Sequence, residues 1–197
     1  CTCFIISSKM LRLLAEETDD ADERCLLLDQ AELSAHLRGQ RSVALANTAF
    51  GIAATGEKRR TVYDAKGKTT LPGKLVRGEG AKAGTDIAVN QAYDGAGATY
   101  DFLREVLKRN SIDGKGARLD STVHYQKNFN NAFWNGQQMV YGDGDGKLFL
   151  GFTGAIDVIA HELTHGLSQH AVPGGLVYED QSGALNESIS DVFGSMV

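Results

Sequence analysis

Two histidines four residues apart, with a glutamate beside the first, are the side chains of this chain best placed for chemistry. They stand in the run His161-Glu162-Leu163-Thr164-His165, inside an apolar stretch that favours a buried helix. On a helix, His161 and His165 project from the same face. That spacing is typical of a zinc site in which the glutamate stays free to act as a base. Buried core histidines would explain one such residue well, but the spaced pair with Glu162 poorly.

A second acidic run supplies the remaining parts of such a site. Glu187, in the run Asn186-Glu187-Ser188-Ile189-Ser190-Asp191, is the candidate third metal ligand, and water would take the fourth position. Glu162 would accept the proton of that water and later deliver it to the leaving amine. Asp191 lies one turn beyond Glu187, and we assign it to the N–H of a ligand histidine, although a solvated carboxylate is the alternative. These residues predict a zinc-dependent peptidase.

Composition limits the other classes of function. The chain has 197 residues, a net charge of −5 and 42% hydrophobic residues, which suits one large domain with a real core. No basic stripe or membrane-length apolar run is present, so we expect neither nucleic acid nor a membrane as partner. Cys1, Cys3 and Cys25 are expected to be free thiols. No secretory signal is visible, so we expect cytoplasmic synthesis, with secretion by a route that needs no such signal as an alternative.

The chain changes character near residue 50. Before it the pattern is helical and poor in glycine, and Asp19 or Asp20 can cap a second helix. Residues 47–60 show no clear period and read as a linker. We therefore predict a detachable helical N-terminal segment over residues 1–50 and a domain over residues 51–197.

The second part alternates strand and helix patterns. We predict strands at 61–64, 74–77 and 121–125, a hairpin of 138–141 with 147–150, and helices at 86–110, 154–169 and from a Ser182 cap onward. Asp143 and Asp145 are interpreted as turn residues, because their spacing lacks the other ligands of a calcium loop. His36 and His124 are expected to be structural.

Longer motifs around these residues resemble the thermolysin family of zinc endopeptidases. They stand in family order in the runs Asn131–Gly136, Met139–Gly146, Asp157–His165 and Gly183–Asp191. The short helical N-terminal segment is most similar to the protealysin branch, whose precursors carry a brief helical propeptide. The resemblance implies an α+β fold: a thermolysin-like N-terminal catalytic domain with a β-rich half and zinc-binding helices, preceded by the propeptide. The family's C-terminal helical domain, the other wall of the cleft, is expected to be absent from residues 51–197.

The resemblance also implies roles for further residues. Asn131 and the carbonyl of Ala132 would hold a peptide or protein substrate as an added strand. Tyr178 would donate a hydrogen bond to the oxyanion of the intermediate. A hydrophobic pocket for the residue after the cleaved bond would be lined by Phe149, Phe152 and Val158. Asp157 would match one carboxylate of a calcium site. On the residues alone, Asn131 and Trp134 could equally be a turn residue and a core aromatic.

Two features depart from the family pattern. The family propeptide has Pro-Pro-x-x-Leu near its start where this chain has Ser7-Ser8-Lys9-Met10-Leu11, so the motif does not establish that the segment docks and inhibits. The turn between His165 and Tyr178 is slightly longer than in thermolysin. His170 within it is expected at the surface, with a stray metal ligand as the alternative.

We therefore predict a zinc-dependent endopeptidase, in precursor form or as a fragment, that cleaves on the amino side of hydrophobic residues. Zinc is the expected cofactor and calcium a second candidate. The expected partners are the substrate, the chain's own N-terminal segment and the missing helical domain. One alternative is a catalytically silent zinc-binding zymogen fragment that lacks the second wall of the cleft. An aminopeptidase with the same histidine motif is disfavoured by the run Asn131–Trp134.

Overall fold

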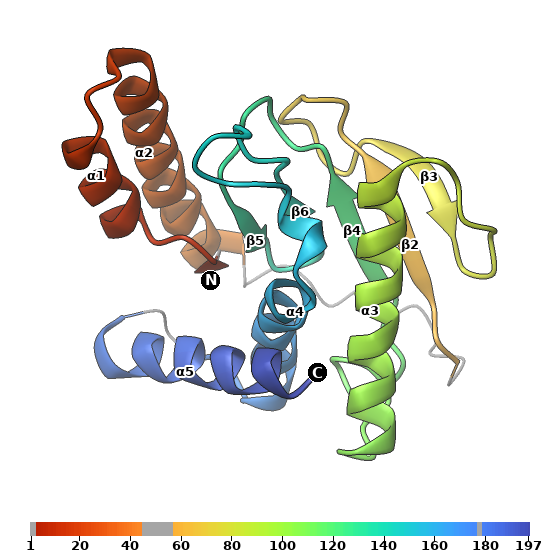
Figure 1. The fold of residues 1–197 in the computed structure, drawn as a ribbon. Helices are drawn as coiled ribbons and strands as arrows, with labels where there is room; N and C mark the ends of the chain where they lie inside the picture. The colour runs from red at the N-terminus through yellow and green to blue at the C-terminus, as the bar shows by residue number, and fades with distance from the viewer. Residues whose placement is uncertain (1–2, 45–56, 177–178) are drawn as a thin grey trace.

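A mixed six-stranded sheet forms the centre of the molecule, with helices on both sides (Figure 1). The computed structural model describes residues 3–44, 57–176 and 179–197. The strand order is β1-β5-β6-β4-β2-β3. β4 lies parallel to β2 and β6, and the other pairs are antiparallel. The strands are β1 Cys3–Phe4, β2 Arg60–Asp64, β3 Lys74–Gly78, β4 Leu119–Val123, β5 Ala132–Trp134 and β6 Met139–Tyr141.

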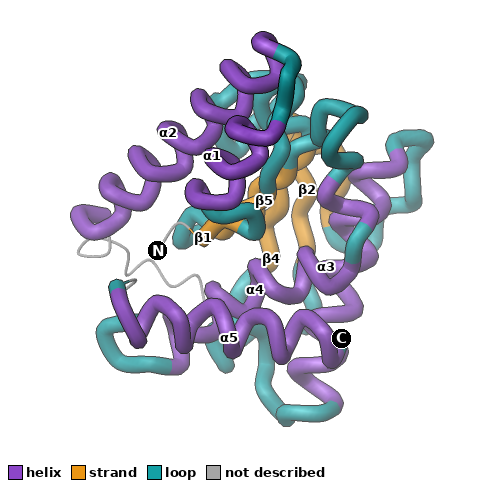
Figure 2. The backbone as a smooth tube through the Cα atoms, turned by 60° about the vertical axis from the view of Figure 1, so that its left-hand side comes forward, coloured by secondary structure: helices purple, strands orange, loops and turns teal. Residues whose placement is uncertain are grey.

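Five α-helices within the described residues surround this sheet, and the α+β class is confirmed (Figure 2). They are α1 Ser8–Glu17, α2 Ala21–Ala44, α3 Ile87–Glu105, α4 Ile156–Ala171 and α5 Asp180–Met196, with a short 3₁₀ helix, η1, at Phe152–Gly154. Helices α3 and α4 pack on the sheet and on each other, and α5 packs on α4. The inward side chains of α3 and α4 form the main core cluster with the sheet. It is composed of Val62, Val89, Ala92, Tyr93, Ala96, Tyr100, Leu103, Ile112, Leu119, Val123, Ala132, Trp134, Met139, Tyr141, Phe152, Ile159, Leu163 and Leu167.

The N-terminal helices pack against a second, aromatic cluster. This aromatic cluster consists of Phe4, Tyr125, Phe129, Phe133 and Val140, and Leu33 and Leu37 of α2 lie against it. The Gln30 side chain donates to the carbonyl of Asn128 (2.8 Å) and accepts from the N–H of Asn130 (3.0 Å). Gln30 is 1% exposed, so this amide is a buried polar link between α2 and the loop before β5. The N-terminal segment is therefore docked on the rest of the chain.

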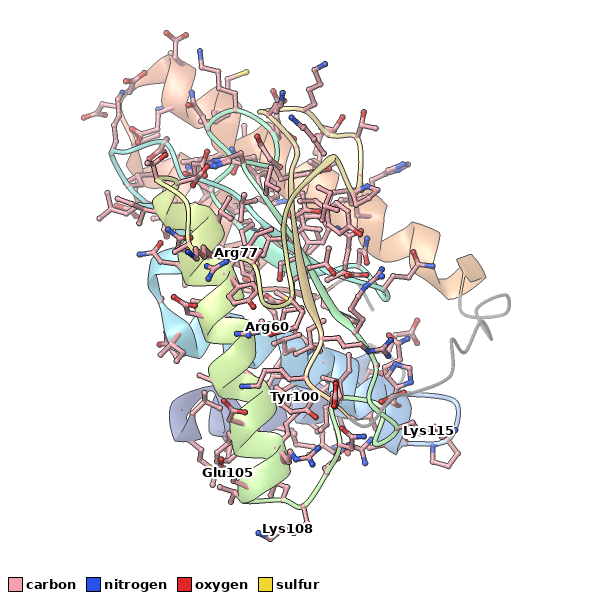
Figure 3. All side chains as sticks on the ribbon, turned by 90° about the vertical axis from the view of Figure 1, so that its right-hand side faces the viewer. Arg60, Arg77, Tyr100, Glu105, Lys108 and Lys115 are labelled. Atoms are coloured by element: carbon pink, nitrogen blue, oxygen red, sulfur yellow. The ribbon has the colours of Figure 1, made fainter. Side chains whose placement is uncertain are left out.

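Two arginines of the β2–β3 pair contact Tyr93 of α3 and hold the pair against that helix. The guanidinium carbons of Arg60 and Arg77 each lie 3.7 Å from the ring centroid of Tyr93. Arg60 also makes two hydrogen bonds to the carboxylate of Glu79, at 2.8 and 2.6 Å. Figure 3 shows both arginines beside the same part of α3. Cation–π contact and a bidentate ion pair thus fix the far edge of the sheet.

The predicted hairpin between 138–141 and 147–150 is wrong in its second arm. The strand β6 forms, but it pairs with β5 and β4, and residues 147–150 form no strand. Asp145 accepts hydrogen bonds from the N–H groups of residues 147, 148 and 149, which folds the chain into a tight loop. Gly144 allows this loop, since it has φ +73° and an added Cβ would lie 2.2 Å from Phe149 O.

The other elements differ from expectation mainly at their ends. Strands β2 and β3 and helix α4 lie within a few residues of the predicted ranges, whereas α3 ends earlier than predicted, at Glu105. Asp20 caps α2 as expected, accepting from the N–H groups of Asp22 and Glu23. Ser182 does not cap α5, because the helix begins at Asp180 and the Ser182 hydroxyl donates to Glu179 O. Most of the predicted linker, residues 45–56, lies outside the described residues.

His124 has a larger structural role than its isolated position in the sequence suggested. Its Nδ1 lies 2.8 Å from Asp143 Oδ2 and its Nε2 lies 3.0 Å from Asp86 Oδ2. Asp86 also caps α3 by accepting from the N–H of Val89. The hydrogen bonds that protonated His124 donates to the carboxylates of Asp143 and Asp86 raise its pKa to about 9, against the opposing effect of partial burial.

This raised pKa predicts a pH-dependent stability. Protonated His124 stabilises the fold fully below its unfolded pKa of about 6.5, and the contribution is lost as pH rises through about 9. We expect it to be on the order of 1 kcal/mol after solvent screening. In thermal melts from pH 6 to 10, His124→Asn, which tolerates the residue's φ of +55°, should flatten the decline. Parallel curves for the two proteins would contradict this assignment.

Candidate metal centre

Two packed helices bring the predicted metal-binding residues together. Helix α4 carries His161 and His165 on the face that meets α5, and α5 carries Glu187. Close packing depends on Gly194, where an added Cβ would lie 2.8 Å from Asp157 O and 3.3 Å from His161 Cβ. The absence of a side chain at Gly194 therefore helps to set the separation of the two helices.

Three side-chain atoms converge at this helix contact. The Nε2 atoms of His161 and His165 are 3.1 Å apart, and Glu187 Oε2 lies 3.2 Å from the first and 3.7 Å from the second. Both histidines are buried, and burial lowers the pKa of His165 to about 4. Neutral imidazoles offer a lone pair to a metal ion. Two imidazole nitrogens and a carboxylate oxygen are a donor set that fits zinc with one position left open.

Neighbouring residues fix the orientation of the histidines. Oδ1 of Asp191 lies 2.9 Å from Nδ1 of His161, without the angles of a hydrogen bond. Nδ1 of His165 lies 3.0 Å from both Asn186 Oδ1 and Ser190 Oγ. An N–H at Nδ1 that donates to Asn186 leaves the Nε2 lone pair of His165 facing the other two ligand atoms. The donor set of this chain therefore fits a divalent cation.

Asn186 and Ser190 were missed by the reasoning from sequence. Both are buried, and they stand four residues apart on α5, on the side that faces α4. The signal was their spacing, because residues i and i+4 share a helix face and these two flank Glu187. Only carboxylates were considered as partners for the two histidines. An amide or a hydroxyl oxygen can orient an imidazole equally well.

Glu162 lies fully buried between α4 and the sheet. Its Oε2 accepts a hydrogen bond from the backbone N–H of Trp134 at 2.9 Å, whereas Oε1 has no hydrogen-bond partner. Burial raises the pKa of Glu162 well above its usual value, and the negative charge of Glu187 acts in the same direction. The N–H groups of Trp134 and Ile5 oppose this effect by favouring the charged form. A carboxylate with one free oxygen and a raised pKa is suited to accept a proton.

The first strand of the chain lies along the edge where the sequence placed a substrate. The N–H of Ile5 donates to Ala132 O at 3.1 Å. The side chain of Asn131 accepts from the N–H of Ile6 (2.9 Å) and donates to its carbonyl (2.8 Å). Asn131 and Ala132 are both fully buried beneath this strand. They therefore hold an extended peptide backbone, which belongs to the N-terminal segment itself.

The remaining predicted residues are placed as follows. Phe149 and Phe152 stack with ring centroids 5.8 Å apart, and Val158 packs against the same main core cluster. Asp157 is exposed near the start of α4. Among the described residues, only His161, His165 and Glu187 form a group of three or more potential metal-binding side chains, so the calcium role of Asp157 stays a prediction. Tyr178 lies outside the described residues.

Comparison with known proteins agrees with this geometry. The sequence profile described as "Thermolysin metallopeptidase, catalytic domain" matches residues 28–169. The chain belongs to the thermolysin family of metallopeptidases. A second profile, "Thermolysin metallopeptidase, alpha-helical domain", matches residues 174–197. The division of this thermolysin-family chain at residue 50 stays a prediction.

Individual relatives extend the similarity into the N-terminal segment. An "Extracellular metalloprotease" of Pectobacterium carotovorum subsp. carotovorum is 47% identical over 200 residues, which cover 99% of this chain and 55% of that protein. "Protease PrtS" of Photorhabdus sp. (strain Az29) is 56% identical over 138 residues, which cover 70% of this chain and 37% of that protein. A solved structure, the precursor of protealysin, a metalloproteinase from Serratia proteamaculans, superposes with a TM-score of 0.80 at 45% identity.

The match to the protealysin precursor covers 99% of this chain and 55% of that one. This thermolysin-family chain thus spans about half the length of both relatives that match it almost throughout. Within the described residues, none of the helices combines the length and the apolar character needed to cross a membrane.

Proposed function

We propose that this chain is part of a zinc-dependent endopeptidase precursor that cleaves peptide bonds on the amino side of hydrophobic residues. The observation that carries the proposal is the convergence of His161 Nε2, His165 Nε2 and Glu187 Oε2 beside the buried Glu162. When bound there, zinc would supply Lewis-acid polarisation of a water molecule and of the substrate carbonyl.

The residues of the chain would perform the remaining tasks. Asn131 and Ala132 bind an extended backbone at the edge of β5, which fixes the bond to be cleaved beside α4. Glu162 takes a proton from water and delivers it to the leaving nitrogen. Asp191 and Asn186 hold the two imidazoles in orientation. We assign to Tyr178 the hydrogen bond to the developing oxyanion.

The specificity follows from the apolar side chains at the start of α4. Phe149 and Phe152 stack on each other, and Phe149 and Val158 both pack against the main core cluster, of which Phe152 is a member. An apolar pocket of this kind favours a hydrophobic residue after the cleaved bond and rejects a charged one.

The N-terminal segment would act as the inhibitor of its own site. Its first strand occupies the edge of β5. Leu33 and Leu37 of α2 pack on the aromatic cluster, and Gln30 of α2 bonds to the backbone of Asn128. A strand tethered to its site has an effective concentration of about 1 mM, so even an affinity of about 0.1 mM would hold activity down roughly tenfold.

A further helical domain is the partner we propose for α5. Leu185, Val192 and Met196 are each about half exposed, and together they form an apolar stripe along the helix. The profile match to an alpha-helical domain over residues 174–197 includes α5 itself, so the proposed partner is the rest of that domain, which the greater length of the relatives supports. That domain would form the other wall of the cleft.

Removal of the N-terminal segment gives a direct test. We expect the whole protein with zinc to digest casein about tenfold faster once the residues before Gly51 have been removed by limited proteolysis. The matched control is the same preparation after dialysis against a chelator, which should be inactive in both forms. Zinc binding without turnover in either form would favour the silent zymogen-fragment alternative.

A further inference from the structure

The backbone of the first strand meets both of the groups that we assign to substrate binding. β1 runs antiparallel to β5, with Phe4 opposite Phe133. The next two residues continue the pairing, since Ile5 donates to Ala132 O and Ile6 makes two hydrogen bonds with the Asn131 side chain. This is β-augmentation by a segment of the same chain.

The side chains of this strand alternate between the two faces of the sheet. Phe4 lies on the aromatic cluster, with its ring centroid 4.9 Å from that of Phe133. Successive residues of a strand point to opposite faces, so Ile5 points toward the face covered by α4. Ile5 packs against the main core cluster, on which Phe149 and Val158 also lie, and its neighbour Ile6 reaches the same cluster. The residue on the proposed pocket side of the strand is therefore hydrophobic.

The position of Glu162 identifies which peptide bond faces the site. A group that takes a proton from water and then donates it to the leaving amine must lie beside the nitrogen of the bond that breaks. The carboxylate of Glu162 is anchored to β5 through the N–H of Trp134, opposite the first strand. The N–H of Ile5 donates to Ala132 O (3.1 Å), and Ala132 lies two residues before Trp134 on the same strand. The nitrogen of Ile5 is thus held by the same short strand, β5, to which the carboxylate of the proposed base is anchored.

We propose that the Phe4–Ile5 peptide bond occupies the position of the bond to be cleaved, and that the site hydrolyses this bond in its own chain. The proposal rests on the proposed function and adds which peptide bond of the first strand lies at the cleavage position. In the reaction, the oxygen of water bonds to the carbonyl carbon of Phe4 and the bond from that carbon to the Ile5 nitrogen breaks. The proton taken up by Glu162 passes to that nitrogen. The second proton of the water also ends on that nitrogen, so the products are a carboxylate at Phe4 and an ammonium group at Ile5, with no oxidation or reduction.

Mass spectrometry of the N-terminus tests this register. The whole precursor, purified and supplied with zinc, should acquire a new N-terminus at Ile5. Its rate of appearance should not change on tenfold dilution, because the bond and the site belong to the same molecule. The same protein with Glu162→Gln should keep the bond intact, which separates self-cleavage from a contaminating protease.

A pair of charged substitutions tests the pocket. Ile5→Asp places a carboxylate against the apolar pocket and should slow the cleavage of this bond at least about tenfold. Ser7→Asp is the matched control. It adds the same charge two residues away, at an exposed position where Asp preserves the cap that Ser7 provides to Met10 N–H. Cleavage in this control should proceed at the wild-type rate.

The outcomes separate this proposal from the proposed function. An intact Phe4–Ile5 bond in a precursor whose shortened form digests casein would overturn the register alone. Equal cleavage rates in Ile5→Asp and Ser7→Asp would do the same. A shortened form that binds zinc but leaves casein intact would instead overturn the proposed function.

Discussion

Glu162→Gln should abolish casein hydrolysis while the zinc content of the protein stays at the wild-type level. The substitution removes the proton acceptor but none of the three convergent ligand atoms, which belong to His161, His165 and Glu187. Loss of a general base alone costs about 10²- to 10⁴-fold in rate. The expected activity is therefore at or below one per cent of that of the wild type, measured on the protein without its N-terminal segment.

The geometry of Glu162 makes this a clean substitution. The glutamine carbonyl can still accept the hydrogen bond from Trp134 N–H, and the volume at this fully buried position is unchanged. The melting temperature should be at least that of the wild type, because a buried carboxylate with one unpaired oxygen is replaced by a neutral amide. A fall in zinc content together with activity would show that Glu162 is a ligand rather than the base.

Local spacing explains why the metal ligands could be predicted from the sequence. His161 and His165 share a helix face whatever the rest of the fold, and an apolar stretch around them already indicated burial. Glu187 required one further assumption, that a second helix packs against the first. Gly194 shows in the structure what makes that contact close.

The docking of the first strand could not be predicted by the same route. β1 comprises only Cys3 and Phe4, too few residues for an alternating pattern, and its partner Trp134 lies far along the chain. Because the family's propeptide motif is not present, it gave no support for docking either. In the structure Ser7 caps α1 and Leu11 is fully buried in a small cluster with Ala15, Leu27 and Ala31, so the segment folds without the two prolines.

Competition between side chain and backbone explains the wrong hairpin. The Gly-rich run after Tyr141 was interpreted as a tight turn between two strands. Asp145 instead satisfies three successive N–H groups that a second strand would have offered to β6. The segment that follows carries Phe149, so the error in strand pairing lay next to the proposed pocket, where the chain departs from regular structure.

Glu187→Ala should remove most of the affinity for zinc. Glu187 supplies the only carboxylate oxygen of the convergent group, and two imidazoles alone bind the ion with one ligand fewer. The loss should exceed the roughly 10- to 100-fold that follows removal of a partner outside the ligand set. Competition with a chromogenic chelator measures this affinity directly, without any assay of turnover.

The zinc affinity of Asp191→Ala should be compared with that of Glu187→Ala. Asp191 contacts the imidazole of His161 at 2.9 Å and lies 74% exposed, so its removal should weaken zinc binding by no more than about 10- to 100-fold. Because zinc stabilises only the folded state that binds it, a chelator should lower the melting temperature of the wild type and of Asp191→Ala, but hardly that of Glu187→Ala. If Asp191→Ala lost more affinity than Glu187→Ala, the two carboxylates would have to exchange roles, with Asp191 on the ion and Glu187 beside it.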